Sequence, residues 1–67
     1  MFHKTDRRNV ARVEAALQRA GLRHTCDAIE AGEGGVVILY AAGGWPVTSV
    51  ESVEEALAWA RDPRRAR

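Results

Sequence analysis

The sequence predicts an α+β fold with the order helix, three antiparallel strands, helix, and with both helices packed on one face of the sheet. Apolar residues recur at helical spacing over residues 6–20 and again after residue 52. Between these segments the period shortens to two, and glycine-rich hairpin turns separate the strands. The 67 residues suffice for one domain only. We expect residues 1–67 to form it, with flexible ends at 1–4 and 63–67.

The first helix is expected over residues 6–20. Thr5 or Asp6 can cap its start, where the helix dipole favours an acidic side chain. Gly21 stands where a glycine in the left-handed conformation commonly ends a helix. The apolar stripe that should face the core consists of Val10, Val13, Leu17 and Ala20.

Two strands should follow. Leu22 to Ile29 alternate between two sets of side chains, which is the pattern of a half-buried strand that would place His24 and Cys26 on one face. Residues 31–35 form a glycine-rich hairpin turn, and residues 36–41 are the clearest strand of the chain.

A tight turn leads to the last strand and the second helix. Gly43 and Gly44 match a two-residue hairpin turn, and residues 45–50 would form a third strand. Pro46 cannot donate a ladder hydrogen bond, which places this strand at the sheet edge.

The second helix begins with the pattern of a capping box, in which the Ser52 hydroxyl caps the helix and Glu55 reaches back. Pro63 sets its end near Asp62. Its apolar stripe consists of Val53, Ala56, Leu57 and Ala60.

This order of elements resembles that of the double-stranded-RNA-binding domain. That resemblance implies a lysine-rich start of the second helix, which would grip phosphates of the RNA. Here the same position reads Ser52-Val53-Glu54-Glu55, and its two carboxylates would repel phosphate. The resemblance is therefore one of topology, and RNA binding at this helix is not expected.

The composition favours a small cytoplasmic protein that associates with itself. A chain of this length has a marginal core, and the single cysteine, Cys26, excludes an internal disulfide and suits a reducing compartment. Residues 1–8 have no apolar stretch behind them, so no signal peptide is expected. The longest apolar run, residues 36–42, is far shorter than the ~20 residues that span a bilayer. We expect a homodimer with no cofactor, metal or membrane contact.

Charge is strongly segregated along the chain. Residues 1–24 contain six Lys or Arg and two acidic residues, residues 25–60 contain six acidic residues and no Lys or Arg, and residues 61–67 contain four Arg and one Asp. Such segregation can orient a binding partner before contact. The candidate basic surface consists of Arg8, Arg12 and Arg19 on one side of the first helix, with Arg64, Arg65 and Arg67 at the C-terminus. The candidate acidic patch consists of Glu51, Glu54 and Glu55.

Each charged cluster also has a structural interpretation. The arginines are compatible with an ordinary solvated helix face, and the glutamates favour the positive end of the second helix. Trp45, at the start of the expected third strand, is a candidate contact residue, whereas Trp59 is expected in the core. His24 and Cys26 lack an orienting partner or a full ligand set, so we expect them to be structural.

The second strand is apolar on both faces, although helices should cover only one. A second subunit or a partner could cover the other face, and we expect Val37, Leu39 and Tyr40 to contribute to that contact. The alternative is that this strand is central and that long neighbouring side chains shield it.

These patterns favour a binding protein over an enzyme. No nucleophile–base pair, carboxylate pair or metal-ligand set is apparent, and the chain is short for a deep pocket. We expect a protein-binding module that occupies the surface of another macromolecule. Compact proteins without motifs are frequent among phage and mobile-element products, including inhibitors of host defence such as anti-CRISPR proteins, and that is an extension of this hypothesis. The alternative is nucleic-acid binding through the arginines of the first helix and of the C-terminus.

Overall fold

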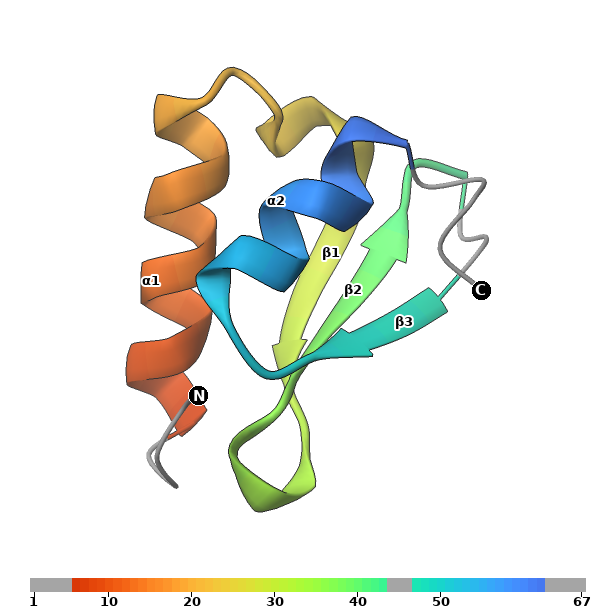
Figure 1. Ribbon diagram of the computed structural model, residues 1–67. Coiled ribbons are helices and arrows are strands. Elements are labelled where there is room, and N and C mark those ends of the chain that lie inside the picture. The colour runs from red at the N-terminus through yellow and green to blue at the C-terminus, as the bar shows by residue number, and fades with distance from the viewer. Residues whose placement is uncertain (1–5, 44–46, 63–67) are drawn as a thin grey trace.

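The fold is the α+β architecture that the sequence predicts (Figure 1). The structure, a computed structural model, describes residues 6–43 and 47–62. The helices are α1 (Asp6–Arg19) and α2 (Val53–Arg61), and the strands are β1 (Cys26–Ala31), β2 (Val37–Ala41) and β3 (Val47–Val50). Two short 3-10 turns, η1 (Arg23–Thr25) and η2 (Glu33–Gly35), precede and follow β1. The predictions for Gly44, Trp45, Pro46 and the C-terminal arginines fall outside the described residues.

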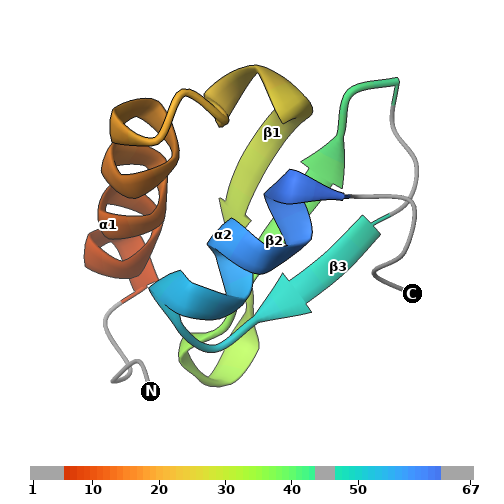
Figure 2. The same cartoon turned by 45° about the horizontal axis from the view of Figure 1, so that its top comes forward.

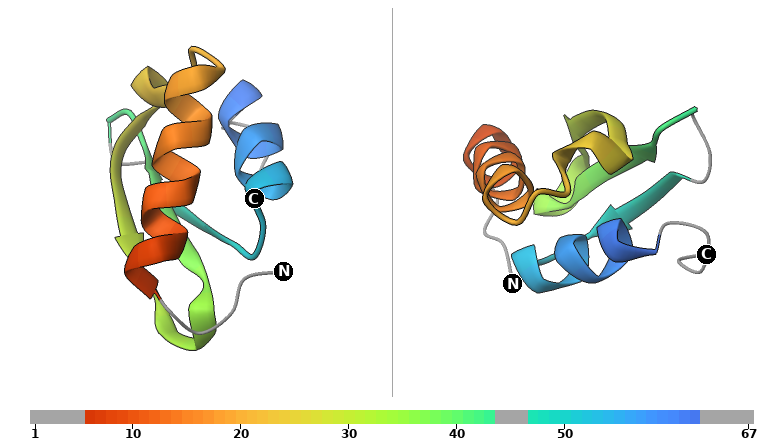
Figure 3. Two further views of the ribbon diagram at one scale, coloured as in Figure 1. Left: turned by 90° about the vertical axis from the view of Figure 1, so that its left-hand side faces the viewer. Right: turned by 90° about the horizontal axis from the view of Figure 1, so that it is seen from above.

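The three strands form one antiparallel sheet in the order β1-β2-β3, so β2 is central. Both helices lie on the same side of the strands (Figure 3). The burial of β2 alternates accordingly, because Val37, Leu39 and Ala41 point toward the helices and are buried while Ile38 and Tyr40 are only partly covered. No helix in the part of the chain that the structure describes is long and apolar enough to cross a bilayer.

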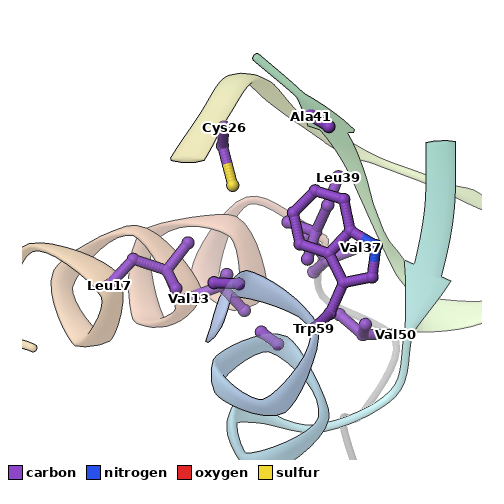
Figure 4. Packing of buried hydrophobic residues seen from close by; sticks show 10 residues of the cluster. Val13, Leu17, Cys26, Val37, Leu39, Ala41, Val50 and Trp59 are labelled. Carbon is purple, nitrogen blue, oxygen red and sulfur yellow. The ribbon is translucent and has the colours of Figure 1, made fainter. Parts of the chain in front are cut away.

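The core lies between the sheet and the two helices (Figure 4). Trp59 of α2 packs against the sheet beside Leu39 and Val50, which confirms its predicted place in the core. Its indole N–H is buried without a hydrogen-bond partner among the described residues. The buried apolar residues are Val13, Leu17, Cys26, Val37, Leu39, Ala41, Val50, Ala56, Trp59 and Ala60.

The signals that predict the end of the first helix and the start of the second are confirmed. Gly21 has a φ of 74°, and the pattern of a Schellman motif follows: the Leu22 N–H donates to the carbonyl of Leu17 at 2.7 Å. At α2, the Ser52 hydroxyl accepts from the Glu55 N–H at 3.1 Å. The Glu55 carboxylate accepts from the N–H of Glu51, so the capping box closes one residue before the position that the sequence predicts.

The prediction that the first strand starts at Leu22 is wrong. Residues 23–25 form η1, because the Thr25 hydroxyl and the Thr25 N–H both donate to the Leu22 carbonyl, at 2.7 and 3.0 Å. The Arg23 guanidinium also closes this turn by donating to the Cys26 carbonyl at 2.7 Å. Local side-chain bonds to the backbone therefore override the alternating pattern, and His24 lies in the turn instead of in a strand.

The turn between β1 and β2 also differs from its prediction, because β1 continues to Ala31 and the turn starts at Gly32. Gly34 and Gly35 take φ values of 70° and 85°, which favour glycine. A Cβ at Gly32 would lie 2.7 Å from a methyl group of the Val36 side chain, so this position has little room for a larger residue.

Asn9 joins this turn to α1. Its side chain is 4% exposed, and its amide Nδ2 donates to the Gly35 carbonyl at 3.0 Å. The bond joins residues 26 positions apart in the chain and holds η2 against the first turns of α1. Asn9 lies beside the apolar stripe of α1, and the sequence alone gave no sign of this role.

We predict that Asn9→Ala lowers the free energy of unfolding by about 1–3 kcal/mol, because the Gly35 carbonyl loses its donor. Asn9→Asp should cost more, since it places a carboxylate against that carbonyl. Urea denaturation followed by circular dichroism measures both. Gln18→Ala, at an exposed position of the same helix, is the control. If Asn9→Ala and the control have the same free energy of unfolding, Asn9 does not hold the turn against α1.

Candidate protein-binding surface

The side of the sheet away from the helices carries a small, mainly uncharged surface. Residues that pair directly across neighbouring strands share a face of the sheet. The cross-strand partners of Tyr40 and Ile38 therefore define this surface. Tyr40 pairs with Val47 of β3, which is 41% exposed and is the exposed large hydrophobic residue of the described chain. We call this surface the outer sheet face; it consists of Ala28, Glu30, Ile38, Tyr40, Val47 and Ser49.

Val37 and Leu39 do not belong to this surface, although the apolar pattern of this strand predicts them in a dimer or partner contact. Both are 0% exposed and pack in the core, so they cannot contact another molecule in the folded protein. Tyr40 does lie on the outer sheet face. The sequence shows that β2 is apolar on both sides, but which side the helices cover depends on how the chain packs. The apolar residues that lie on the outer sheet face are Ile38, Tyr40 and Val47.

A side-chain pair crosses from β2 to β1 on this face. The Tyr40 hydroxyl donates to the Glu30 Oε1 at 3.1 Å, and both groups are open to solvent. The hydrogen bond to Glu30, and secondarily the negative charge of Glu30, raise the pKa of Tyr40 above its usual 10.0. The pair fixes the position of the phenol and brings a carboxylate next to the exposed apolar residues.

The β1 side of the sheet is acidic. Asp27, Glu30 and Glu33 are all exposed, and they lie on β1 or in the turn that follows it. Asp27 is the extra residue of a bulge between the pairs formed by Cys26 and Ala28, and its Oδ2 accepts from the Gly43 N–H at 3.1 Å. This bond ties β1 to the start of the β2–β3 connection.

The helical side of the molecule carries the basic residues that the sequence singled out. Arg8, Arg12 and Arg19 are exposed, and no ion pair joins them to another described residue. Arg23 differs, because its Nε lies 3.4 Å from the Glu14 Oε2 and its guanidinium also bonds the backbone. The arginines at 64 and 65 fall outside the described residues.

The three glutamates of the predicted acidic patch, Glu51, Glu54 and Glu55, are exposed at the start of α2. The first turn of α2 lies beside α1 (Figure 2), so the acidic patch and the exposed arginines of α1 are carried by neighbouring helices. The Glu55 carboxylate is bonded to the backbone N–H of Glu51, whereas the carboxylates of Glu51 and Glu54 are exposed and make no such bond to another described residue.

His24 and Cys26 do not share a strand face, contrary to the sequence-based pattern. His24 is exposed in η1, whereas the Cys26 side chain is 6% exposed and belongs to the core. Burial raises the pKa of the Cys26 thiol, and the Thr25 hydroxyl and Arg23 charge offset this only in part. Within residues 6–43 and 47–62, no three His, Cys, Asp or Glu side chains are grouped so that they could hold a metal ion.

Comparisons of the chain with protein-family models, curated proteins and solved structures give no significant match.

We predict that Tyr40, the single tyrosine of the chain, ionises above pH 10.0 in the folded protein and that Glu30→Gln lowers this value. Absorbance of tyrosinate near 295 nm follows the titration, and Glu33→Gln is the matched control. Because the folded protein holds this proton more tightly, the stabilisation is present below pH 10.0 and is lost as pH rises through the raised pKa. If wild type, Glu30→Gln and Glu33→Gln titrate at the same pH, the interaction between Tyr40 and Glu30 is contradicted.

We further predict that Cys26 reacts slowly at pH 8 with an aromatic disulfide that releases a chromophore when a thiol attacks it. The thiol of Cys26 is buried and its pKa is raised. Denaturant should accelerate the reaction. The variant Ala15→Cys adds an exposed thiol on α1. It should release one equivalent of chromophore quickly, from the added thiol, and one slowly, from Cys26. Two fast equivalents without denaturant would contradict the buried position.

Proposed function

We propose that this protein is a non-enzymatic protein-binding module that acts by occupying the surface of another macromolecule, and that the outer sheet face makes the contact. The observation that supports this proposal is the position of Ile38, Tyr40 and Val47 side by side on the one sheet face that the helices leave open. Apolar and aromatic groups at the centre with polar groups around them are typical of the cores of protein interfaces.

The sheet is a suitable support for such a contact. Its inner side is fixed by the core, since Val37, Leu39 and Val50 have exposures of 3% or less. The outer side chains therefore project from a backbone that two helices hold in place, and binding need not order it. A rigid surface loses less conformational entropy on association than a loop does.

The size of the face limits the contact. Three strands spaced ~4.8 Å apart and about five residues long offer a projected area of only a few hundred Å², whereas each side of a standard interface contributes ~800 Å². A partner of standard affinity would therefore extend beyond the face, over β1 and its turns or beyond β3. The homodimer expected from the sequence stays a prediction within this proposal, because a second subunit is one molecule that could supply such an area.

Nucleic-acid binding through Arg8, Arg12 and Arg19 is the second candidate. The observation in its favour is that these exposed side chains make no ion pair with a described residue. On duplex DNA this binding would weaken with salt, with a log–log slope of about −0.9 for each phosphate contacted. Replacing all three arginines by Gln should then reduce both the affinity and the slope, as measured by fluorescence anisotropy with a labelled duplex. Absence of binding at low salt would exclude this candidate.

For the protein-binding proposal, we predict that Val47→Asp abolishes capture of the cognate partner from cells of the source organism. A charge at position 47, next to Tyr40, must be desolvated on binding. Because Val47 is exposed on the edge strand β3, the same charge leaves the core intact. Capture on immobilised protein, quantified by mass spectrometry, compares the variant with wild type. Circular dichroism must show that the variant remains folded.

The matched control is Arg12→Asp, which introduces the same residue at an exposed position of α1. Glu54→Arg is a further probe of the acidic patch, and it is preferable to a change at Glu55, which would also remove the bond from the Glu51 N–H to the Glu55 carboxylate. A partner that is retained by Val47→Asp and lost by Arg12→Asp would contradict the assignment of the contact to the sheet.

A further inference from the structure

We propose that the partner segment that binds the outer sheet face is cationic: a protein segment in which apolar side chains are flanked by arginine. This inference rests on the proposed function and specifies the partner's chemistry. It follows from the charges of the sheet and its connections, from the position of Glu30 beside Tyr40, and from the way in which Arg23, just before β1, is already bound.

The charged side chains of the sheet and of its connections have a single sign. No Lys or Arg occurs between Arg23 and Arg61, so neither the sheet nor its connections contain a basic side chain. Asp27, Glu30 and Glu33 are exposed along the β1 side. A partner with acidic groups would therefore meet only carboxylates there, whereas a cationic partner would meet complementary charge.

Arg23 does not neutralise this side. Its guanidinium donates to the Cys26 carbonyl at 2.7 Å, and its Nε lies 3.4 Å from the Glu14 carboxylate. These two contacts hold the cation between α1 and the beginning of β1. The carboxylate of Glu30 is instead bonded to Tyr40 and stays exposed.

Glu30 and Tyr40 together fit an arginine of the partner. A carboxylate that accepts one hydrogen bond from the phenol keeps further lone pairs for a guanidinium. The ring of Tyr40 is partly exposed beside it, and a guanidinium that pairs with the carboxylate can also stack on an aromatic ring. Ile38 and Val47 are the nearest apolar contacts, which explains the requirement for apolar residues next to the arginine.

The same charges disfavour a second copy of this chain and nucleic acid as occupants of the outer sheet face. In a two-fold dimer through this face, each surface would meet itself, so the Glu30 carboxylates of both copies would enter one interface without a base. Nucleic acid would bring phosphates to the same carboxylates. A cationic protein segment is the class that gains from these side chains.

The test uses three synthetic peptides of about ten residues, which share a Val-Tyr-Val centre and carry two Arg, two Gln or two Glu around it. Each is titrated into the isotopically labelled full chain, and backbone amide shifts are followed by NMR. We expect the arginine peptide to shift the amides of Ile38, Tyr40 and Val47, with weaker binding as salt rises. Glu30→Gln should weaken it about two- to fivefold, which is typical of one exposed ion pair, and Glu54→Gln should not.

Other outcomes separate this inference from the proposed function. Equal binding of all three peptides at the outer sheet face would support protein binding there but overturn the cationic partner. Shifts confined to α1, or no binding by the arginine peptide, would also overturn the cationic partner. The proposed function is decided separately, by whether wild type captures the cognate partner and Val47→Asp loses it. A dimer by light scattering that Val47→Asp dissociates would show that a second copy occupies the face, and would overturn the cationic partner as well.

Discussion

The fold depends on one constraint: two short helices can cover only one side of a three-stranded sheet. Every residue of the core lies between α1, α2 and the inner side of the strands. Burial of Leu39, Val37 and Trp59 supplies the apolar contact that a chain of this length needs, and nothing in the two helices is left to cover the opposite side. The same packing that stabilises the protein therefore leaves Ile38, Tyr40 and Val47 accessible.

Charge follows this division into two sides. The exposed arginines lie on α1, which is beside the acidic start of α2, whereas the charged residues of the sheet are all acidic. Arg23 connects the two regions, because it bonds Glu14 of α1 and the backbone of β1. Two surfaces of different chemistry thus belong to one small domain, and each could contact a different class of molecule without change in the fold.

Local signals were sufficient to predict one end of each helix, although the local turn that Thr25 forms with Leu22 was not predicted. Gly21 and Ser52 end and begin helices through contacts with residues at most five positions away, and both were predicted. The structural role of Asn9 was not predicted, because its partner Gly35 is 26 residues away in the chain. The two residues meet only when α1 packs on the hairpin turn. The assignment of Val37 and Leu39 to the open side failed for a similar reason, since an alternating strand does not show which of its faces meets the helices.

The bulge at Asp27 determines the phase of β1. Cys26 pairs with Ala41 on the inner side and Ala28 pairs with Tyr40 on the outer side, although two residues separated by one position would otherwise share a side. Asp27 thus absorbs one residue of chain length. A relative with the same fold but without the bulge would be one residue shorter here, and an alignment that follows the apolar pattern through Cys26 without a gap would place every outer residue of β1 on the wrong side.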